Sequence, residues 1–350
     1  MWIRVTTGVS VTAGKKAGID KEDHMKSIDE LMLNRRQALA LGLGSVATFG
    51  LAACGGSDGG ATDAAPADDA AADDASTEID AEAFDALVSS GPVADDADIE
   101  ASEWAKKVKA AGKLRVGGVE TSTLFSQLNE VDGKHRGFDA GLFQLLATYL
   151  FDNSSAYDLT LVQSSTRESV LQNDTVDAVF ATYTINDERK KLISFAGPYY
   201  VGHQGILVKA GNTDIKGVED LAGKIVGVQE GSNGRAVVEE YAPEAEIQEL
   251  GTDEELRRTL EQGRIDAYVV DATLHMGSII ENPGKYELAA EFGPEDPLGI
   301  GLPLDSDGVA FVNDFLAKIE DAGLWSQLYM ICLGSRIGVD VAPEPPAIEA

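Results

Sequence analysis

The sequence has few cysteines, few histidines and few cations for its 350 residues. Its two cysteines, Cys54 and Cys332, lie far apart, and its four histidines lack the spacing of metal ligands, so neither a disulfide framework nor a metal site is expected. Only 28 lysines and arginines stand against 59 aspartates and glutamates. Because a phosphate backbone would repel so acidic a chain, nucleic acid is a poor candidate partner.

A hydrophobic run long enough to span a bilayer is also missing near the N-terminus. The apolar run from Ala38 to Phe49 is shorter than the ~20 residues that a transmembrane helix needs. Arg35 and Arg36 precede this run, and the small residues Ala52 and Ala53 follow it. A basic head, a short apolar stretch and small residues are typical of an export signal. Residues 1–54 are therefore interpreted as a signal region.

The end of this region, Leu51-Ala52-Ala53-Cys54, resembles the bacterial lipobox, which implies that Cys54 receives a lipid and anchors the protein to the cell membrane outside the cytoplasm. The arginine pair resembles a twin-arginine signal whose flanks match loosely, so that route and general secretion both stay open. Because export signals begin at the N-terminus, translation is expected to start at Met25 or Met32. Cys332 lies in an apolar run and is expected to be a buried, inert thiol.

A stretch without cations follows the signal. No lysine or arginine occurs from Ser57 to Glu103, and alanine, aspartate, glycine and glutamate dominate. Low hydrophobicity with charge of one sign predicts an extended, solvated segment. We therefore expect residues 55–103 to form an acidic disordered tether, with one short helix at Ile79–Val88.

Beyond residue 103, apolar strands alternate with amphipathic helices, and the alternation starts again after residue 223. Such alternation predicts parallel sheets covered by helices, here in two similar lobes. Two extended stretches, 204–209 and 297–303, are interpreted as paired crossings between the lobes. The predicted units are lobe 1 (104–203 and 304–335), lobe 2 with its hinge strands (204–303) and a flexible tail (336–350).

Several separated segments together resemble the polar amino acid solute-binding proteins of ABC importers, which are bacterial extracellular solute-binding proteins of family 3. In order, the segments are Gly112–Gly117, Gly137–Asp139, Asp177–Arg189, Ser194–Tyr200, Leu221–Ser232 and Gly263–Asp271. The resemblance implies an α/β fold with two periplasmic-binding-protein-like lobes of type II and a two-strand hinge. It also implies an amino acid ligand, an ABC permease as partner, no cofactor and a monomer.

The resemblance assigns the ligand carboxylate to the first lobe. Arg189 stands where the family clamps the α-carboxylate, with Thr182 and Thr184 supplying hydroxyl or backbone contacts. A planar guanidinium suits a carboxylate because two N–H groups meet two oxygens. The alternative is that Arg189 is a surface charge at the start of a helix.

The resemblance assigns the remaining contacts to the second lobe. Asp271 stands where the family pairs an aspartate with the α-ammonium, although an aspartate there could also serve only as a helix cap. Ser232 and Asn233 open a helix whose amides would face the carboxylate. Threonine is commoner at the position of Asn233.

Side-chain specificity is indicated by two further segments. The segment 120–126, which contains Ser122, and the segment 164–167 resemble those of glutamate and aspartate binders, in which an arginine at the position of Arg167 contacts the distal carboxylate. Glutamate is therefore the leading ligand, with glutamine, aspartate or another polar amino acid as alternatives.

The other basic positions of those binders do not match, because they fall near Val119 and Asp253. Arg136 and His135 are the candidates to substitute for them, although nothing in the sequence shows that they do. The fold also hosts dehydratases, for which His203 and His275 are candidate general acids, and a signalling ectodomain is a third possibility. The favoured mechanism is non-catalytic: ligand docks on lobe 1 and Asp271 helps lobe 2 to close over it.

Overall fold

A computed structural model describes residues 77–349. The predicted signal region, the predicted lipid-attachment residue Cys54 and residues 55–76 of the predicted tether lie outside these described residues. Within them, no helix is both long and apolar enough to cross a bilayer.

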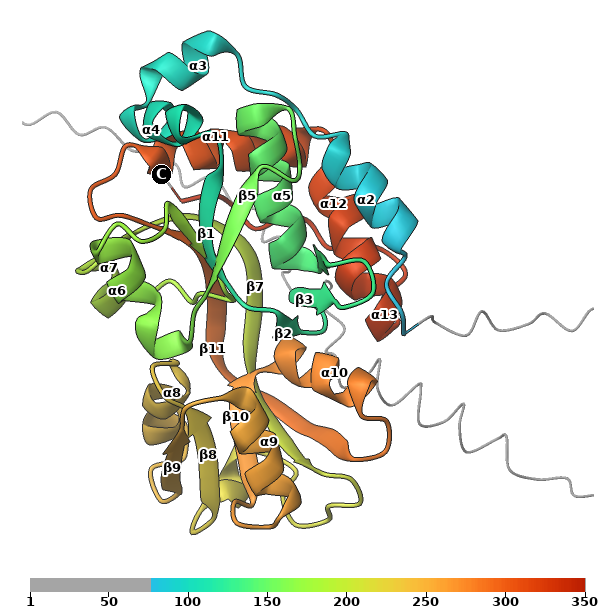
Figure 1. Cartoon of the computed structure of the whole chain (residues 1–350). Helices are drawn as coiled ribbons and strands as arrows, with labels where there is room; N and C mark the ends of the chain where they lie inside the picture. The colour runs from blue at the N-terminus through green and yellow to red at the C-terminus, as the bar shows by residue number, and fades with distance from the viewer. Residues whose placement is uncertain (1–76, 350) are drawn as a thin grey trace, which may run out of the picture. The chain divides into compact units, whose positions relative to one another are not determined.

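The two lobes share one eight-stranded sheet in the order β5-β1-β6-β11-β7-β10-β8-β9 (Figure 1). Its strands are β1 (Leu114–Gly118), β5 (Tyr157–Leu161), β6 (Ala178–Phe180), β7 (Ser194–Lys209), β8 (Ile225–Gln229), β9 (Glu246–Leu250), β10 (Ala267–Asp271) and β11 (Tyr286–Leu302). Lobe 1 contains the parallel trio β5-β1-β6, and lobe 2 contains the parallel trio β10-β8-β9.

The long strands β7 and β11 join the two trios. They pair antiparallel from Ser194 opposite Leu302 to Lys209 opposite Tyr286, with three register shifts. Both predicted crossings, 204–209 and 297–303, fall mostly within this ribbon. Two neighbouring strands of this kind can act as a hinge because the lobes otherwise carry separate cores.

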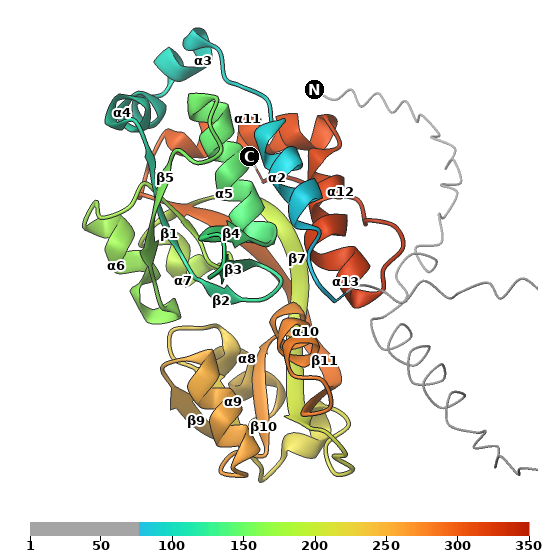
Figure 2. The same cartoon turned by 45° about the vertical axis from the view of Figure 1, so that its right-hand side comes forward.

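Helices cover both halves of the sheet (Figures 1 and 2). Lobe 1 carries α4 (Glu103–Ala111), α5 (Phe138–Phe151), α6 (Arg167–Gln172), α7 (Asp187–Lys190), α11 (Gly308–Asp321), α12 (Leu324–Tyr329), η3 (Met330–Gly334) and α13 (Ser335–Ile337), with a small sheet of β2 (Thr121–Ser122), β3 (Ser126–Asn129) and β4 (Lys134–Arg136). Lobe 2 carries η2 (Val218–Leu221), α8 (Gly234–Tyr241), α9 (Asp253–Glu261) and α10 (Ala272–Glu281). The predicted α/β architecture of two lobes is confirmed.

Helix α5 is the centre of the lobe 1 core. Its residues from Phe138 to Leu150 are all buried, since strands cover one side and α2, α11 and α12 contact the other. Cys332 is fully buried nearby, which confirms the predicted burial. Burial raises the pKa of its thiol, so the reactive thiolate is disfavoured.

The structure differs from the predicted tether in its second half. Residues of that segment form α2 (Ala81–Ser89) and α3 (Asp96–Ala101), capped by Asp80 and Asp95. The apolar side chains of α2, Phe84 among them, are buried against lobe 1. The prediction of disorder is therefore wrong for residues 81–103, while the short helix predicted at Ile79–Val88 is confirmed. The prediction of disorder was wrong here because it used the average composition of the segment, in which a few apolar residues at helical spacing count for little.

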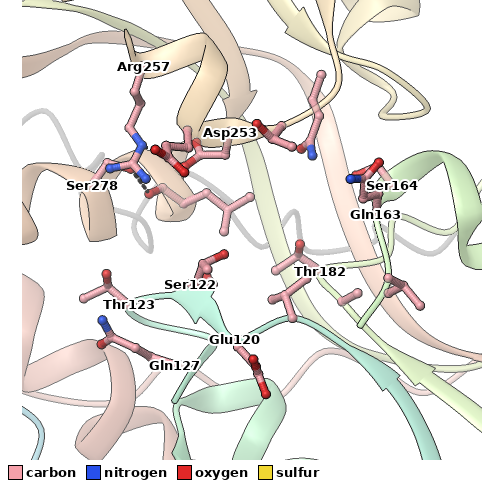
Figure 3. A pocket seen from close by; sticks show the side chains of 18 of the residues that line it. Glu120, Ser122, Thr123, Gln127, Gln163, Ser164, Thr182, Asp253, Arg257 and Ser278 are labelled. Atoms are coloured by element: carbon pink, nitrogen blue, oxygen red, sulfur yellow. Dashed lines mark hydrogen bonds and ion pairs between the residues drawn. The ribbon is translucent and has the colours of Figure 1, made fainter. Parts of the chain in front are cut away.

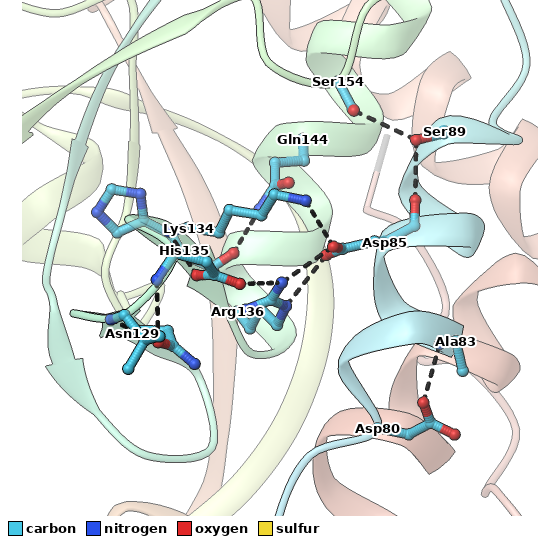
Figure 4. A network of polar contacts seen from close by, with 12 residues as sticks. Asp80, Ala83, Asp85, Ser89, Asn129, Lys134, His135, Arg136, Gln144 and Ser154 are labelled. Carbon is cyan, nitrogen blue, oxygen red and sulfur yellow. Dashed lines mark hydrogen bonds and ion pairs between the residues drawn. The ribbon is translucent and has the colours of Figure 1, made fainter.

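An ion-pair network fixes α2 to the small sheet (Figure 4). The buried Arg136 donates from Nε and Nη2 to the Asp85 carboxylate at 3.0 and 2.9 Å, and Nη2 also contacts Asp132 at 2.8 Å. Lys134 adds a further contact to Asp85 at 2.7 Å.

The predicted flexible tail also differs from the structure. Arg336 is buried and donates to the backbone carbonyls of Thr77 and Thr123 at 2.9 and 2.6 Å. Near the end of the chain, the Glu349 amide donates to the Gly197 carbonyl at 2.9 Å. The tail therefore lies on lobe 1, because these backbone and charged contacts hold it there.

Candidate functional site

A cavity of about 620 Å³ lies between the two lobes (Figure 3). Polar side chains from both lobes line it. Lobe 1 contributes Glu120, Ser122, Thr123, Gln127, Gln163, Ser164, Arg167 and Thr182, and lobe 2 contributes Asp253, Glu254, Arg257, Tyr268, Ser278 and Glu281. A concave polar site between two domains joined by a hinge is a usual place for a small polar ligand.

Two arginines of lobe 1 lie together beside one end of this site, where Arg167 lines the cavity and Arg189 lies behind its lining. Their guanidinium carbons lie over the Tyr183 ring, 4.1 Å from its centroid for Arg167 and 5.0 Å for Arg189. Both side chains are buried, with 4% and 7% of the residue exposed. Arg189 belongs to α7, which Asn186 caps by accepting the Arg189 amide at 2.9 Å. The alternative that Arg189 is a surface charge is therefore wrong.

Both arginines donate to one backbone oxygen of the opposite lobe. The Gly231 carbonyl accepts from Arg189 Nη2 at 3.0 Å and from Arg167 Nη2 at 3.4 Å. Gly231 has φ +75° and lies so close to lobe 1 that a Cβ would come within 2.5 Å of Ser165 Cα. The lobes thus meet at the point where two guanidiniums converge on an acceptor.

The remaining contacts of the arginines leave this end of the site positively charged. Arg167 Nη1 donates to the Ala181 carbonyl at 3.0 Å, and Arg189 Nη1 donates to the Thr184 carbonyl at 2.7 Å. One carboxylate, Glu168, lies 3.6 Å from Arg189 Nε. Burial and the like charge of Arg189 lower the pKa of Arg167 to about 9, so Arg167 remains cationic at neutral pH. Burial also lowers the pKa of Arg189. Such a pair suits a ligand carboxylate.

The two predicted threonines occupy different positions. Thr182 lines the cavity in a left-handed conformation (φ 43°), and its amide donates to Asp139 at 2.9 Å. Thr184 is buried in a bridge to Leu298 beside Arg189 and does not line the cavity. Asp139 is fully buried and also accepts from Tyr199 at 2.7 Å, and desolvation raises its pKa to about 6. Asp139 therefore holds the backbone of Thr182 in place through the hydrogen bond from its amide.

Asp271 lies at the hinge and not on the cavity surface. It is 4% exposed and caps α10, because its Oδ1 accepts from the Thr273 amide at 2.8 Å. Its Oδ2 has no partner among the described residues. Burial and the nearby Asp296 raise the pKa of Asp271 to about 7. The capping role is confirmed, and contact with a ligand ammonium stays a prediction.

The predicted helix-start residues of lobe 2 do not line the cavity either. The Ser232 amide donates to the Gln229 carbonyl at 3.1 Å, so it is used within its own turn. Asn233 Nδ2 donates to Asp296 at 3.0 Å, and Gln204 donates to the same oxygen at 2.6 Å. The contact with the arginines comes instead from Gly231, one residue earlier.

Of the specificity residues, Ser122 and Arg167 line the cavity, and the suggested substitutes do not. Arg136 is bound to Asp85 on the outer side, and His135 lies between Glu120 and Tyr157 at 3.0 and 2.9 Å. Sequence analysis missed Arg257 and Glu281 of lobe 2. The spacing of Asp253 and Arg257, four residues apart on one helix, was the available signal.

Comparison with known proteins gives consistent matches. A model of the bacterial extracellular solute-binding proteins, family 3, matches residues 114–334. The ABC transporter glutamine-binding protein GlnH of Bacillus subtilis is 33% identical over 239 residues, covering 66% of this chain and 86% of that protein. The glutamate-binding protein GluB of Corynebacterium glutamicum is 29% identical over 234 residues, covering 62% and 79%. A solved ancestral arginine-binding protein bound to arginine has a TM-score of 0.59 and 31% identity, covering 64% and 98%.

Proposed function

Because this chain belongs to the bacterial extracellular solute-binding proteins of family 3, we propose that it captures a polar L-α-amino acid between its lobes for an ABC importer. One observation carries the proposal. Two buried guanidiniums of lobe 1, Arg167 and Arg189, converge on a single oxygen beside an interlobe cavity. An α-carboxylate offers this arrangement two oxygens in place of one.

Capture proceeds by closure about the β7–β11 ribbon. The Gly231 carbonyl occupies the arginine pair in this conformation, so a ligand carboxylate would replace it as the acceptor. A ligand can shift the lobes only through contacts that improve in the closed state. We assign that role to Asp271, whose unpartnered Oδ2 would accept from the ligand ammonium.

Location and partners follow from the same proposal. The lipobox-like sequence before Cys54 supports a lipid anchor on the outer side of the cell membrane. The closed form would be the form that a membrane permease recognises, and the protein would act as a monomer. Release of the protein from membranes by substitution of Cys54 tests the anchor separately from ligand binding.

The ligand within this class is not fixed by the relatives, since those compared bind glutamine, glutamate and arginine by name. The segments around Ser122 and Arg167 favour glutamate, followed by glutamine and aspartate. However, part of the arginine pair is already used within lobe 1, because Arg167 Nη1 donates to the Ala181 carbonyl and Arg189 Nη1 donates to the Thr184 carbonyl. The two Nη2 groups, which converge on Gly231, are left for one carboxylate. We assign it the α-carboxylate.

We infer binding without catalysis. The candidate general acid His275 is fully buried on α10, and desolvation lowers its pKa to about 3, so at neutral pH it is not the imidazolium that a general acid requires. His203 lies in the hinge strand β7 and does not line the cavity. A dehydratase would need a positioned acid facing its substrate.

Calorimetric titration of the full chain with the common L-amino acids tests the proposal. Micromolar or tighter binding is expected, reduced at least about 100-fold in Arg189→Lys, since an ammonium cannot replace a bidentate fork. Arg235→Lys, at an exposed arginine of α8, is the matched control and should bind normally. No binding to any amino acid would refute the proposed function.

A further inference from the structure

The ionisable groups that line the cavity are mostly acidic. Five carboxylates face two guanidiniums in the lining, and no lysine or histidine contributes. The carboxylates are Glu120, Glu130, Asp253, Glu254 and Glu281, and the guanidiniums are Arg167 and Arg257. A ligand that carries a second negative charge would therefore meet an unfavourable field.

The two arginines of the lining differ in how available they are to a ligand carboxylate. Arg167 lies beside Arg189 at the lobe 1 end and is available to the α-carboxylate. Arg257, across the cavity in lobe 2, is already shared by two carboxylates: its Nε donates to Asp253 at 2.7 Å, and its Nη1 lies 3.6 Å from Glu281. We call Asp253, Arg257 and Glu281 the acidic wall. Its net charge is negative because two anions surround one cation.

The positions of these groups divide the cavity by charge (Figure 3). Arg257 and Asp253 lie on the lobe 2 side, and Glu120 and Ser122 lie opposite them on lobe 1. Arg167 of the arginine pair lies at a different end, where it donates to the carbonyls of Thr182 and Ser164. An amino acid held by its carboxylate on the pair would extend its side chain toward the acidic wall.

A buried tyrosine of lobe 2 lies beside the acidic wall. Tyr268 lines the cavity, is fully buried and directs its hydroxyl toward the Asp253 carboxylate. Burial and the charge of Asp253 raise the pKa of this hydroxyl, so it stays neutral. A neutral hydroxyl beside Asp253 can donate to this carboxylate and help to hold it in the wall.

We propose that the acidic wall selects an L-α-amino acid whose side chain ends in a guanidinium or an ammonium, with Asp253 and Glu281 as specificity-determining residues. The inference rests on the proposed function, because it concerns the same cavity. Opposite charges favour the cationic ligand, and like charges disfavour glutamate. The Asp253 and Glu281 side chains are 39% and 40% exposed, so the closed cavity has to exclude part of this solvent for the selection to be strong.

Calorimetric titration of the full chain at pH 7 with L-arginine, L-lysine, L-glutamine and L-glutamate tests the inference. L-Arginine or L-lysine is expected to bind at least about 100-fold more tightly than L-glutamate. In the double variant Asp253→Asn/Glu281→Gln, affinity for the cationic ligand should fall about 100-fold, while affinity for L-glutamate should rise about 10-fold because Arg257 loses its partners. Misfolding cannot produce that gain.

Glu239→Gln is the control for the loss of a carboxylate, since Glu239 is exposed, paired with Arg235 and outside the cavity lining. It should leave the ligand order unchanged. Tighter binding of L-glutamate than of the cationic amino acids by the unmodified chain would overturn the inference and leave the proposed function standing. An absence of binding to every amino acid would remove both.

Discussion

Replacing Asp271 with asparagine is expected to stabilise the unliganded protein at alkaline pH while weakening amino acid binding. Burial and the charge of Asp296 raise the pKa of Asp271 from 3.8 to about 7. At about 1.4 kcal/mol per pKa unit, keeping this carboxylate charged in the folded state costs up to about 4 kcal/mol. Asparagine keeps an oxygen for the Thr273 amide and carries no charge.

The direction of the pH dependence follows from proton binding. Because the folded state holds its proton to higher pH than the unfolded state, this group's stabilisation is complete below the unfolded pKa and is lost as pH rises toward about 7. Asp139, whose pKa is raised to about 6, acts in the same direction. The difference between the parent and Asp271→Asn isolates Asp271, and it should grow from near zero at pH 4 to about 2–4 kcal/mol at pH 8.

Urea denaturation followed by circular dichroism at both pH values measures this difference. Parallel loss of stability by parent and variant would refute the reasoning, because it would place the pH dependence elsewhere. The same variant separates the two roles of Asp271. Unchanged ligand affinity would leave the residue as a helix cap only.

Three further outcomes are expected. Gly231→Ala should weaken ligand binding at least about 10-fold, because the added Cβ would clash with lobe 1. Gly211→Ala is the control, since Gly211 has a similar φ but no neighbour within 4 Å, and it should bind normally. Equal affinities of the two variants in calorimetry would contradict this prediction. Arg136→Ala should lower the free energy of unfolding by about 2 kcal/mol, since it leaves Asp85 without its bidentate partner. An unchanged free energy of unfolding in urea denaturation would count against this ion pair as the contact that holds α2. Cys332 should react with a thiol reagent only after denaturation, and rapid native labelling would disprove its burial.

Much of the fold could be predicted because each lobe repeats one local pattern. Buried parallel strands such as β8 and β10 have continuous apolar runs, and the helices between them show a helical period. The second half of the predicted tether was missed for the opposite reason. Its order depends on contacts with α5 and on the ion pair to Arg136, which lie far away in the sequence.

The candidate site was predictable only in part. Arg189 and Thr182 lie in one motif near the end of β6, so the sequence alone indicated their proximity. The acidic wall required knowledge of how α9 packs beside α10, because Asp253 and Glu281 approach Arg257 from different helices. The Gly231 contact is made by a backbone carbonyl, a group that every residue carries, so the sequence gives no sign of it.

Both ends of the described chain are fastened to lobe 1. Thr77 is held by Arg336, and Glu349 is held by Gly197 and Lys190. Lobe 2 is connected through β7 and β11 alone in covalent terms. A pulling force on either end would therefore act first on lobe 1 and on the contacts that hold Thr77 and Glu349, and the β7–β11 hinge would carry no tension. Lobe 2 is joined to lobe 1 by these two strands and by contacts such as that of Gly231 with the arginines, so a restraint at either end of the chain does not act on lobe 2 directly.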